Sequence, residues 1–238
     1  MRRTIAVMTF GMLALAPLSA SAGSLDLRLG AFFPAASECN GKVPCGSPNL
    51  FDDDRELYLK DLQPLKDSDW IGFSGGIAYN AKLARYLELS VHLDGYGRTL
   101  HTSARDFVSE SGREITQSLK FEEVPFGASL RIVPTGRNVR FAPFVVVGGD
   151  LVYWHYDEFG DFVDFETGDI IHDVTFHSDA VAPGFHVGGG LRVAVTDDVR
   201  LVGEYRYMWA KDDMGDDFRG NKIDLGGSFA TLGVNIRF

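Results

Sequence analysis

The sequence predicts an all-β fold: a closed, eight-stranded, antiparallel up-and-down β-barrel that crosses a membrane. Eight segments of about ten residues alternate between apolar and polar or small side chains, which is the period of a strand with two different faces. The connections between these segments alternate between short and long. After an export-type leader, the chain has no apolar run long enough for a spanning helix, so it would have to cross a membrane as a closed barrel.

Residues 1–22 are predicted to be a cleaved signal peptide, and residues 23–238 the barrel domain. Arg2 and Arg3 form a positively charged start, residues 5–18 are mostly apolar, and residues 20–22 are small, as a cleavage site requires. Cleavage of this signal peptide would remove both arginines and change the formal net charge from −10 to −12. Export also places Cys39 and Cys45 in an oxidising compartment, and we expect a disulfide between them.

The first four strands are expected at residues 24–33, 71–79, 87–94 and 124–132. In the first, apolar Leu27 and Leu29 alternate with charged Asp26 and Arg28, so the two sets lie on opposite faces. The other three repeat this pattern. Their apolar faces comprise Ile71, Phe73, Ile77, Tyr79, Leu87, Leu89, Val91, Leu93, Val124, Phe126, Leu130 and Ile132.

The last four strands are expected at residues 139–153, 185–193, 199–207 and 230–238. The alternation in the first of these is blurred by three consecutive valines at 145–147. In the second, glycine, histidine and arginine occupy the face opposite the aliphatic residues. The apolar faces comprise Phe141, Val145, Val147, Leu151, Phe185, Val187, Leu191, Val193, Val199, Leu201, Tyr205, Tyr207, Ala230, Leu232, Val234, Ile236 and Phe238.

The lengths of the connections favour a membrane barrel over a soluble sandwich or lipocalin-type barrel, in which no such rule is expected. Residues 80–85, 134–138 and 196–198 make short turns, whereas 34–69, 99–116, 155–175 and 210–222 are predicted as long loops. This pattern is typical of short periplasmic turns and long extracellular loops. Aromatic residues near the strand ends are predicted to form girdles at the two interfaces. They are Trp70, Tyr79, Tyr86, Tyr96, Tyr153, Trp154, Tyr207, Trp209 and Phe238.

The polar faces should meet inside the barrel, since an eight-stranded barrel is filled by its own side chains. Charges removed from water must be paired, so a network of ion pairs is expected in the lumen. Its candidate residues are Arg28, Glu88, Asp150, Glu204 and Arg206, with Asp26 and Asp94 also predicted inside. An arginine-rich mouth is predicted near the short turns, formed by Arg131, Arg140, Arg192, Arg200 and Arg237. Such a lumen disfavours flow, although a narrow channel or transporter of small solutes stays as the alternative function.

The negative charge lies mainly in the predicted long loops. Residues 155–175 contain seven carboxylates and no lysine or arginine. Asp161, Asp164, Glu166 and Asp169 are candidate ligands for Ca²⁺ or Mg²⁺, but their spacing matches no defined calcium loop, and a solvated acidic surface is the favoured interpretation. The sign of the charge argues against a nucleic-acid partner, and no cofactor is expected.

Histidines near the third long loop raise the question of catalysis. Residues 177–179 read His-Ser-Asp, but adjacent strand residues point to opposite faces, so no enzyme is predicted. A lipid A-modifying enzyme remains the less favoured alternative. His155, His172 and His177 could approach one another across this loop, either as a metal site or by chance.

Several motifs resemble those of small outer-membrane barrels of the OmpA, OmpX and opacity-protein type. The chain ends at Phe238, with apolar Ile236 and Val234 at the two preceding alternate positions. The glycine-rich segments 142–149 and 188–191, and the segment 204–207, resemble strands five, six and seven of that superfamily.

This resemblance covers the mature chain and specifies architecture rather than activity. It implies location in the cell outer membrane, among lipid and lipopolysaccharide. It also implies that Phe238, Ile236 and Val234 form a signal read by the barrel-assembly machinery. The expected role is structural or surface interaction: envelope integrity, adhesion or host contact through the acidic loops, where divalent cations or a surface ligand would bind.

Overall fold

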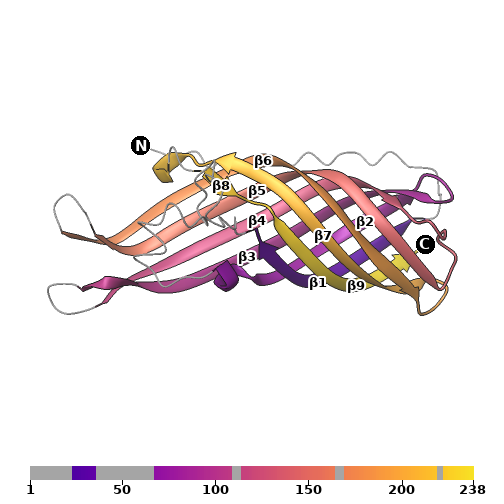
Figure 1. Cartoon of the computed structure of the whole chain (residues 1–238), viewed down its shortest axis with the longest axis horizontal. Helices are drawn as coiled ribbons and strands as arrows, with labels where there is room; N and C mark the ends of the chain where they lie inside the picture. Colours follow the sequence, from indigo (N-terminus) through magenta and orange to yellow (C-terminus); the bar gives the residue numbers. More distant parts are fainter. Residues whose placement is uncertain (1–22, 36–66, 109–113, 164–168, 219–221) are drawn as a thin grey trace, which may run out of the picture.

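Antiparallel strands wind around a common axis in the computed structural model of the chain (Figure 1). The structure describes residues 23–35, 67–108, 114–163, 169–218 and 222–238. The predicted signal peptide and the predicted Cys39–Cys45 disulfide lie outside the described residues. The elements are β1 (Ser24–Pro34), η2 (Asp67–Trp70), β2 (Gly72–Lys82), β3 (Leu87–Val108), β4 (Glu114–Ile132), β5 (Phe141–Val163), β6 (Ile170–Ala194), β7 (Val199–Asp213), η3 (Asp216–Phe218), β8 (Lys222–Asp224) and β9 (Gly227–Arg237).

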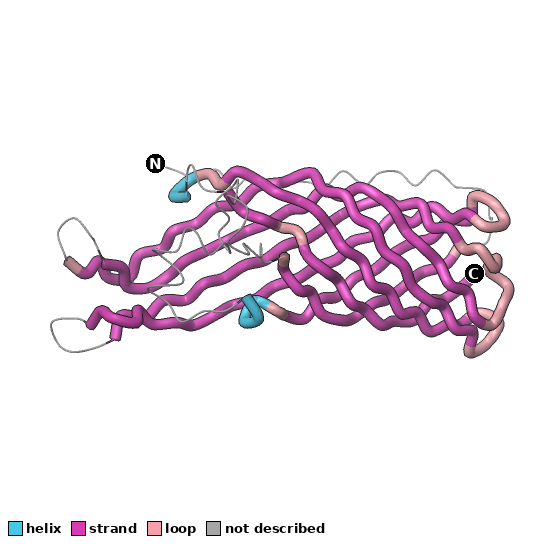
Figure 2. Tube along the Cα trace, in the orientation of Figure 1, coloured by secondary structure: helices cyan, strands magenta, loops and turns pink. Residues whose placement is uncertain are grey.

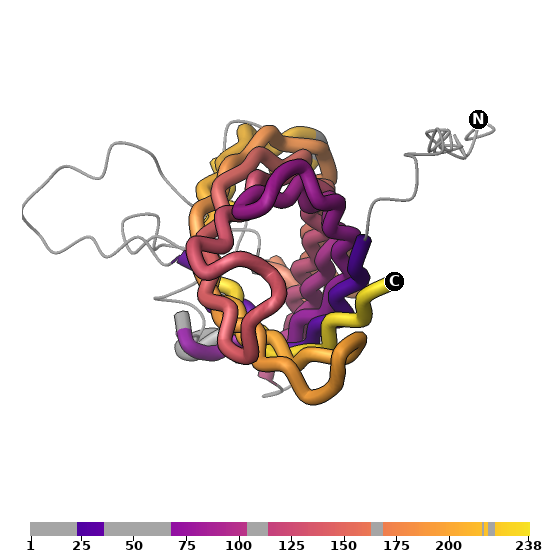
Figure 3. The backbone as a smooth tube through the Cα atoms, turned by 90° about the vertical axis from the view of Figure 1, so that its right-hand side faces the viewer, coloured from indigo at the N-terminus to yellow at the C-terminus, as the bar shows by residue number. Residues whose placement is uncertain are grey.

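Eight of the strands form a closed, hydrogen-bonded ring. Strands β1 to β7 pair in sequence order, β7 then pairs with β9, and β9 pairs with β1, all antiparallel. The short strand β8 pairs with the end of β7 and lies outside the ring. Figure 3 shows the ring viewed along the barrel. Within the ring, each strand is paired on both sides, which is what lipid requires. The predicted eight-stranded antiparallel barrel is confirmed.

The outside of the ring is covered by apolar side chains. Leu29, Phe73 and Leu232 are 61%, 67% and 74% exposed, and they belong to a band of exposed aliphatic and aromatic residues. Soluble monomers rarely expose apolar patches larger than a few hundred Å², so this band is suited to contact lipid. The part of the chain that the structure describes contains no helix long and apolar enough to span a membrane.

The register across β4, β5 and β6 marks the outer edge of the apolar band. Val124, Tyr153 and Val181 are paired neighbours, and all three side chains are exposed on the outside. Two positions further along each strand, the outward side chains become ionisable, which places them in the headgroup region or in water. The next two rows are Glu122, His155 and Asp179, then Lys120, Asp157 and His177.

The predicted long loops at 99–116 and 155–175 are wrong for most of their length, because the strands continue through them, whereas in the predicted loop 210–222 only residues 210–213 and 222 belong to strands. The hairpins β3–β4 and β5–β6 project well beyond the ends of β1, β2 and β9 (Figures 1 and 2). Most outward positions become polar there, but most inward positions stay apolar, as at Phe121, Tyr156 and Phe162. The strand period therefore persists after the lipid-facing pattern has ended. We call residues 99–108, 114–122, 155–163 and 170–179 the projecting sheet.

The short turns lie at the opposite end of the barrel, together with the C-terminus (Figure 2). They span residues 83–86, 133–140 and 195–198, in agreement with the predicted short connections. The prediction that Arg140 faces the lumen is wrong. Arg140 is exposed because it belongs to the turn before β5.

Three of the predicted girdle aromatics are also placed differently. Trp70, Tyr96 and Trp154 are only 4%, 4% and 0% exposed and pack inside the barrel. Tyr96 and Trp154 occupy inward positions of strands that continue past the membrane edge. Their position near a predicted strand end therefore did not indicate a place in an interface girdle. Tyr86, Tyr153, Trp209 and Phe238 do lie on the outside, where girdle residues belong.

Candidate functional site

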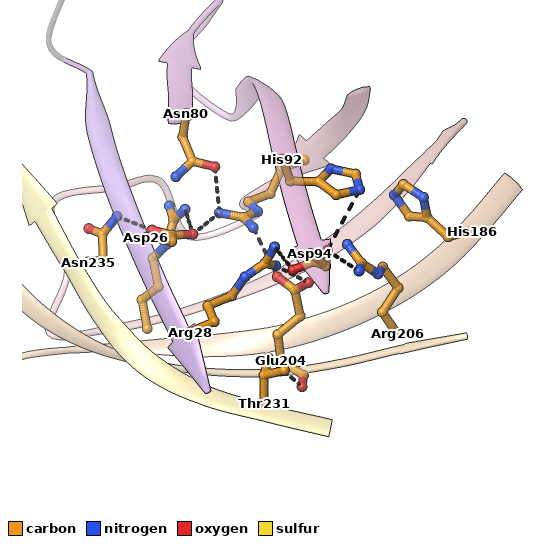
Figure 4. A network of polar contacts seen from close by, with 12 residues as sticks. Asp26, Arg28, Asn80, His92, Asp94, His186, Glu204, Arg206, Thr231 and Asn235 are labelled. Atoms are coloured by element: carbon orange, nitrogen blue, oxygen red, sulfur yellow. Dashed lines mark hydrogen bonds and ion pairs between the residues drawn. The ribbon is translucent and has the colours of Figure 1, made fainter. Parts of the chain in front are cut away.

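The half of the lumen nearer the short turns contains a network of buried ion pairs (Figure 4). Glu204 accepts hydrogen bonds from Arg28 Nη1 at 2.6 Å and from Arg131 Nη2 at 2.9 Å. Arg28 also donates to Asp94 at 3.0 Å, and Asp94 pairs in turn with Arg206. These five side chains are at most 7% exposed, so their charges are neutralised by one another rather than by water.

The network extends toward the periplasmic mouth through two more carboxylates. Asp26 accepts hydrogen bonds from Arg131 at 3.0 Å and from Asn235. Glu88 pairs with Arg192 at 2.8 Å and with Arg137 at 2.7 Å. Acidic and basic groups therefore alternate across the lumen, from β1 to β9. We call these residues, together with those of the preceding paragraph, the ionic network.

Two glycines on the inward face make room for buried carboxylates. A Cβ atom at Gly76 would lie 1.8 Å from Asp94 Oδ1. At Gly127, it would lie 2.2 Å from Asp150 Oδ1 and 2.8 Å from His92 Cε1. Real Cβ atoms do not come this close to other atoms, so a larger residue at either position would displace the carboxylate. Glycine at these positions therefore leaves space for the large side chains of the neighbouring strands.

Asp150 lies beside the ionic network but has different partners. His92 Nε2 is 2.9 Å from its Oδ1 atom, and His186 Nδ1 is 2.6 Å from its Oδ2 atom. The two imidazole rings lie 5.1 Å apart, nearly perpendicular to each other. His92 and His186 are 3% and 1% exposed, so this group of three side chains is buried inside the barrel.

The outer half of the lumen is filled by apolar side chains, which we call the outer plug. Trp154 and Tyr156 are completely buried, and Trp154 Nε1 donates to Asp212 Oδ2 at 2.9 Å. The plug and the ionic network together occupy the barrel from one end to the other. The plug comprises Phe32, Trp70, Tyr96, Leu100, Leu119, Phe121, Val152, Trp154, Tyr156, Ala182, Met208, Ala210, Met214, Ile223, Leu225 and Phe229.

The predicted lumen residues are all buried, but they do not form one group. Arg28, Glu88, Glu204 and Arg206 belong to the ionic network, whereas Asp150 is held by histidines. In the predicted arginine mouth, Arg131, Arg192 and Arg200 are buried, while Arg237 is half-buried and donates to Asn138 at 3.2 Å. Sequence reasoning placed three of the polar partners across the barrel on inward faces but did not pair them with these charges, and it assigned the fourth, Asn80, to a turn. These partners are Asn80, His92, His186 and Asn235.

The candidate cation ligands are not gathered in the described part of the chain. Asp161 is 3.0 Å from His172 Nδ1 and accepts a hydrogen bond from the Asp173 N–H at 3.2 Å. Asp169 is exposed, and Asp164 and Glu166 lie outside the described residues. Cation binding at this hairpin therefore stays a prediction.

Three of the four histidines of the projecting sheet each have a separate acidic partner, whereas His101 contacts the Ser118 hydroxyl at 2.8 Å. His155 lies 2.8 Å from Asp157, and His177 lies 3.2 Å from Asp217, while His172 is held by Asp161. Among the described residues, they do not join into one metal-binding group.

Two side chains on the inner side of the projecting sheet influence each other's ionisation. The Tyr156 hydroxyl donates to Glu158 Oε1 at 2.8 Å. Burial raises the pKa of Glu158 above its ordinary value, although the hydrogen bond from Tyr156 opposes the shift. Burial also raises the pKa of Tyr156, and the Glu158 charge adds to that effect. Because the folded sheet favours neutral Glu158, this residue contributes more stability at low pH and loses that contribution as pH rises.

The predicted assembly residues lie on the outside of the strand that closes the ring. Phe238 is 70% exposed, and its ring stacks on Tyr79 with the centroids 6.3 Å apart. Ile236 and Val234 face the same side, and each is paired with β1 on one flank and β7 on the other. These residues are therefore accessible from the lipid at the periplasmic end.

The profile of a family described as outer membrane protein beta-barrel domain matches residues 5–238. The chain belongs to this family. The barrel accordingly resides in the outer membrane, as the apolar band and the closed ring require. No curated protein matches the sequence.

Several solved structures of outer-membrane proteins are similar to this family member. OprG from Pseudomonas aeruginosa is 12% identical, with a TM-score of 0.51, over 92% of this chain and 96% of that one. Neisserial surface protein A is 16% identical, with a TM-score of 0.48, over 91% and 97%. A major outer membrane protein from Thermus thermophilus is 15% identical, with a TM-score of 0.48, over 92% and 100%. At these identities the similarity to OprG shows the fold alone.

Proposed function

We propose that this protein is a sealed outer-membrane anchor that presents its projecting sheet to a positively charged partner at the cell surface. Such contact would serve adhesion, host binding or the integrity of the envelope. The observation that carries the proposal is the contrast between the two parts of the barrel. The lumen is occupied by the ionic network and the outer plug. The strands β3 to β6, however, remain paired far beyond the apolar band.

The charge on the outside of the projecting sheet indicates the kind of partner. Acidic residues outnumber lysine and arginine among the described side chains of this face, and four histidines are also present. An excess of one sign attracts partners of the opposite sign and raises their rate of association. A basic protein segment or a polyamine fits this face, whereas a polyanion does not. Among the side chains that the structure describes on this face, the acidic residues are Glu114, Glu122, Asp157, Asp161, Asp173 and Asp179, and the base is Lys120.

A channel is the competing function, and the packing of the lumen disfavours it. Glu204 bridges Arg28 and Arg131, which come from strands on opposite sides of the barrel. Above them, the fully buried Trp154 and Tyr156 fill the outer half. A solute would have to displace both layers.

The arrangement of the His177–Ser178–Asp179 segment disfavours hydrolysis. His177 faces outward and is held by Asp217, whereas Ser178 is fully buried and accepts a hydrogen bond from the Gly215 N–H at 3.1 Å. The histidine cannot serve as a base for a serine on the opposite face of the strand.

Binding of a fluorescent lysine oligomer to the purified barrel in nanodiscs tests the proposal. The triple variant Asp157→Asn, Asp161→Asn and Asp179→Asn should bind roughly tenfold more weakly than the wild type, because the local field is reduced. The double variant Asp197→Asn and Asp198→Asn is the matched control, since these exposed aspartates lie in a short turn at the other end. Equal binding by wild type and triple variant would refute the proposed role of this face.

A further inference from the structure

The group formed by His92, Asp150 and His186 is separate from the surface face and has no place in the proposed function. The three side chains come from β3, β5 and β6, and all point into the lumen. Figure 4 shows the two histidines side by side next to Asp94 and Arg206. Among the described residues, this is the one group of three or more potential ligands whose ligand atoms all lie within 4.8 Å of one another.

Asp150 differs from the carboxylates of the ionic network in the charge of its partners. Asp26, Glu88, Asp94 and Glu204 each pair with at least one arginine. Asp150 pairs with His92 and His186, and no arginine contacts it within the described chain. If both imidazoles are neutral, the Asp150 carboxylate has no cationic side chain in direct contact, which favours a bound cation.

Two unpartnered polar groups provide an independent sign that something else binds here. His186 Nε2 is buried and has no hydrogen-bond partner in the described part of the chain. Glu123 is completely buried further out along β4, and both of its carboxylate oxygens lack a partner there. Glu123 is also close enough to interact electrostatically with Asp150. Buried polar groups are normally satisfied, so a missing partner in this region calls for an explanation.

We propose that His92, Asp150 and His186 bind one zinc ion inside the barrel. Two imidazoles and one carboxylate form a ligand set that zinc accepts, with a fourth position left for water or another group. The same set disfavours Ca²⁺ and Mg²⁺, which prefer oxygen ligands. His186 Nδ1 is the nitrogen that now contacts Asp150 and would serve as the ligand, while its buried Nε2 atom has no hydrogen-bond partner in the described part of the chain.

The geometry needs little rearrangement to accept the ion. Zinc binds nitrogen and oxygen at about 2.0–2.2 Å, so ligand atoms around a tetrahedral ion lie about 3.3–3.5 Å apart. His92 and His186 now approach the Asp150 oxygens to 2.9 Å and 2.6 Å. Opening these two contacts by less than about 1 Å would replace two hydrogen bonds with metal–ligand bonds, provided that the two histidine ligand atoms, which now lie within 4.8 Å of each other, also move to the same separation. Gly127 leaves the space into which Asp150 and His92 fit.

The test uses Co²⁺, which takes zinc ligand sets and absorbs visible light in a tetrahedral site. The mature barrel is refolded in detergent with Co²⁺ or Zn²⁺ present and then washed with a chelator. Wild-type protein should retain about one ion per chain and show the tetrahedral Co²⁺ absorption. The variants His92→Gln and His186→Gln should lose at least about tenfold in affinity. His177→Gln should bind as the wild type does, because that histidine lies outside the barrel with its own partner, Asp217.

Folding of each variant is checked by the change in gel mobility on heating. If the lumen variants fail to fold, the wild-type measurement alone decides. Folded wild type that retains no Co²⁺ or Zn²⁺ would overturn the proposal, and the three residues would then be a hydrogen-bonded group only. Equal retention by wild type and folded His92→Gln would overturn it as well. Neither result bears on oligolysine binding, so the two proposals can fail separately.

Discussion

Replacing Arg131 with methionine is expected to lower the free energy of unfolding by about 3–5 kcal/mol, the cost of breaking a buried ion pair by removing one partner. Arg131 is 1% exposed and donates to Asp26 at 3.0 Å, to Asn80 at 2.9 Å and to Glu204 at 2.9 Å. Methionine fills part of the volume but leaves these acceptors with fewer donors in a space that excludes water. The measurement is urea-induced unfolding of the barrel in lipid vesicles, followed by tryptophan fluorescence.

Arg140→Met is the matched control, because Arg140 is exposed in the turn at the same end of the barrel. Its unfolding free energy should change by less than about 0.5 kcal/mol, as is usual for surface substitutions. Adding Glu204→Gln to Arg131→Met should recover part of the loss, since one of the carboxylates deprived of a partner is then neutral. A change of less than about 1 kcal/mol for Arg131→Met would contradict a paired and dehydrated lumen.

The variant Phe238→Asp is expected to be almost absent from the outer membrane of cells, with precursor accumulating in the periplasm. The reason is recognition rather than stability. Phe238 lies at the rim of the apolar band and is 70% exposed, and a charge near the interface costs only about 0–1 kcal/mol. Fractionation of membranes, with gel mobility before and after heating, measures the assembled protein.

Refolding the same variant in vesicles separates the two explanations. Phe238→Asp should fold there with nearly wild-type stability, while its assembly in cells fails. Arg237→Gln is the control, since Arg237 is the neighbouring residue on the other face. Normal insertion of Phe238→Asp in cells would show that the terminal residue is not part of an assembly signal in this protein.

The barrel itself could be predicted because its pattern is local. Each strand shows its two faces within a few residues, as where Leu27 and Leu29 alternate with Asp26 and Arg28. The short turns interrupt that pattern, so both the number of ring strands and the inward-facing residues follow from the chain. The projecting sheet could not be predicted in the same way. Between Val124 and Glu122 the outward side chains change from apolar to charged. The start of an extracellular loop shows the same change in sequence, so the two cases look alike.

The contacts across the lumen depend on how far each strand is displaced along its neighbours. His92 and His186 are both inward in the alternation, but they lie on β3 and β6, which are separated by two other strands. Their meeting at Asp150 follows from the accumulated register of three strand pairs. No local pattern contains that information. Because this register is not visible in the sequence, Asp150 was expected to pair with arginines, whereas in the structure its partners are histidines.

Single-channel recording in planar bilayers tests most directly whether the barrel is sealed. The ionic network links side chains from opposite walls, and the outer plug closes the other half, so the reconstituted protein should show no stable, long-lived conductance. Heat-modifiable gel mobility of the same sample establishes that the barrel is folded. Long-lived current steps of uniform size, in proportion to the folded protein added, would contradict the sealed lumen and make this protein a channel.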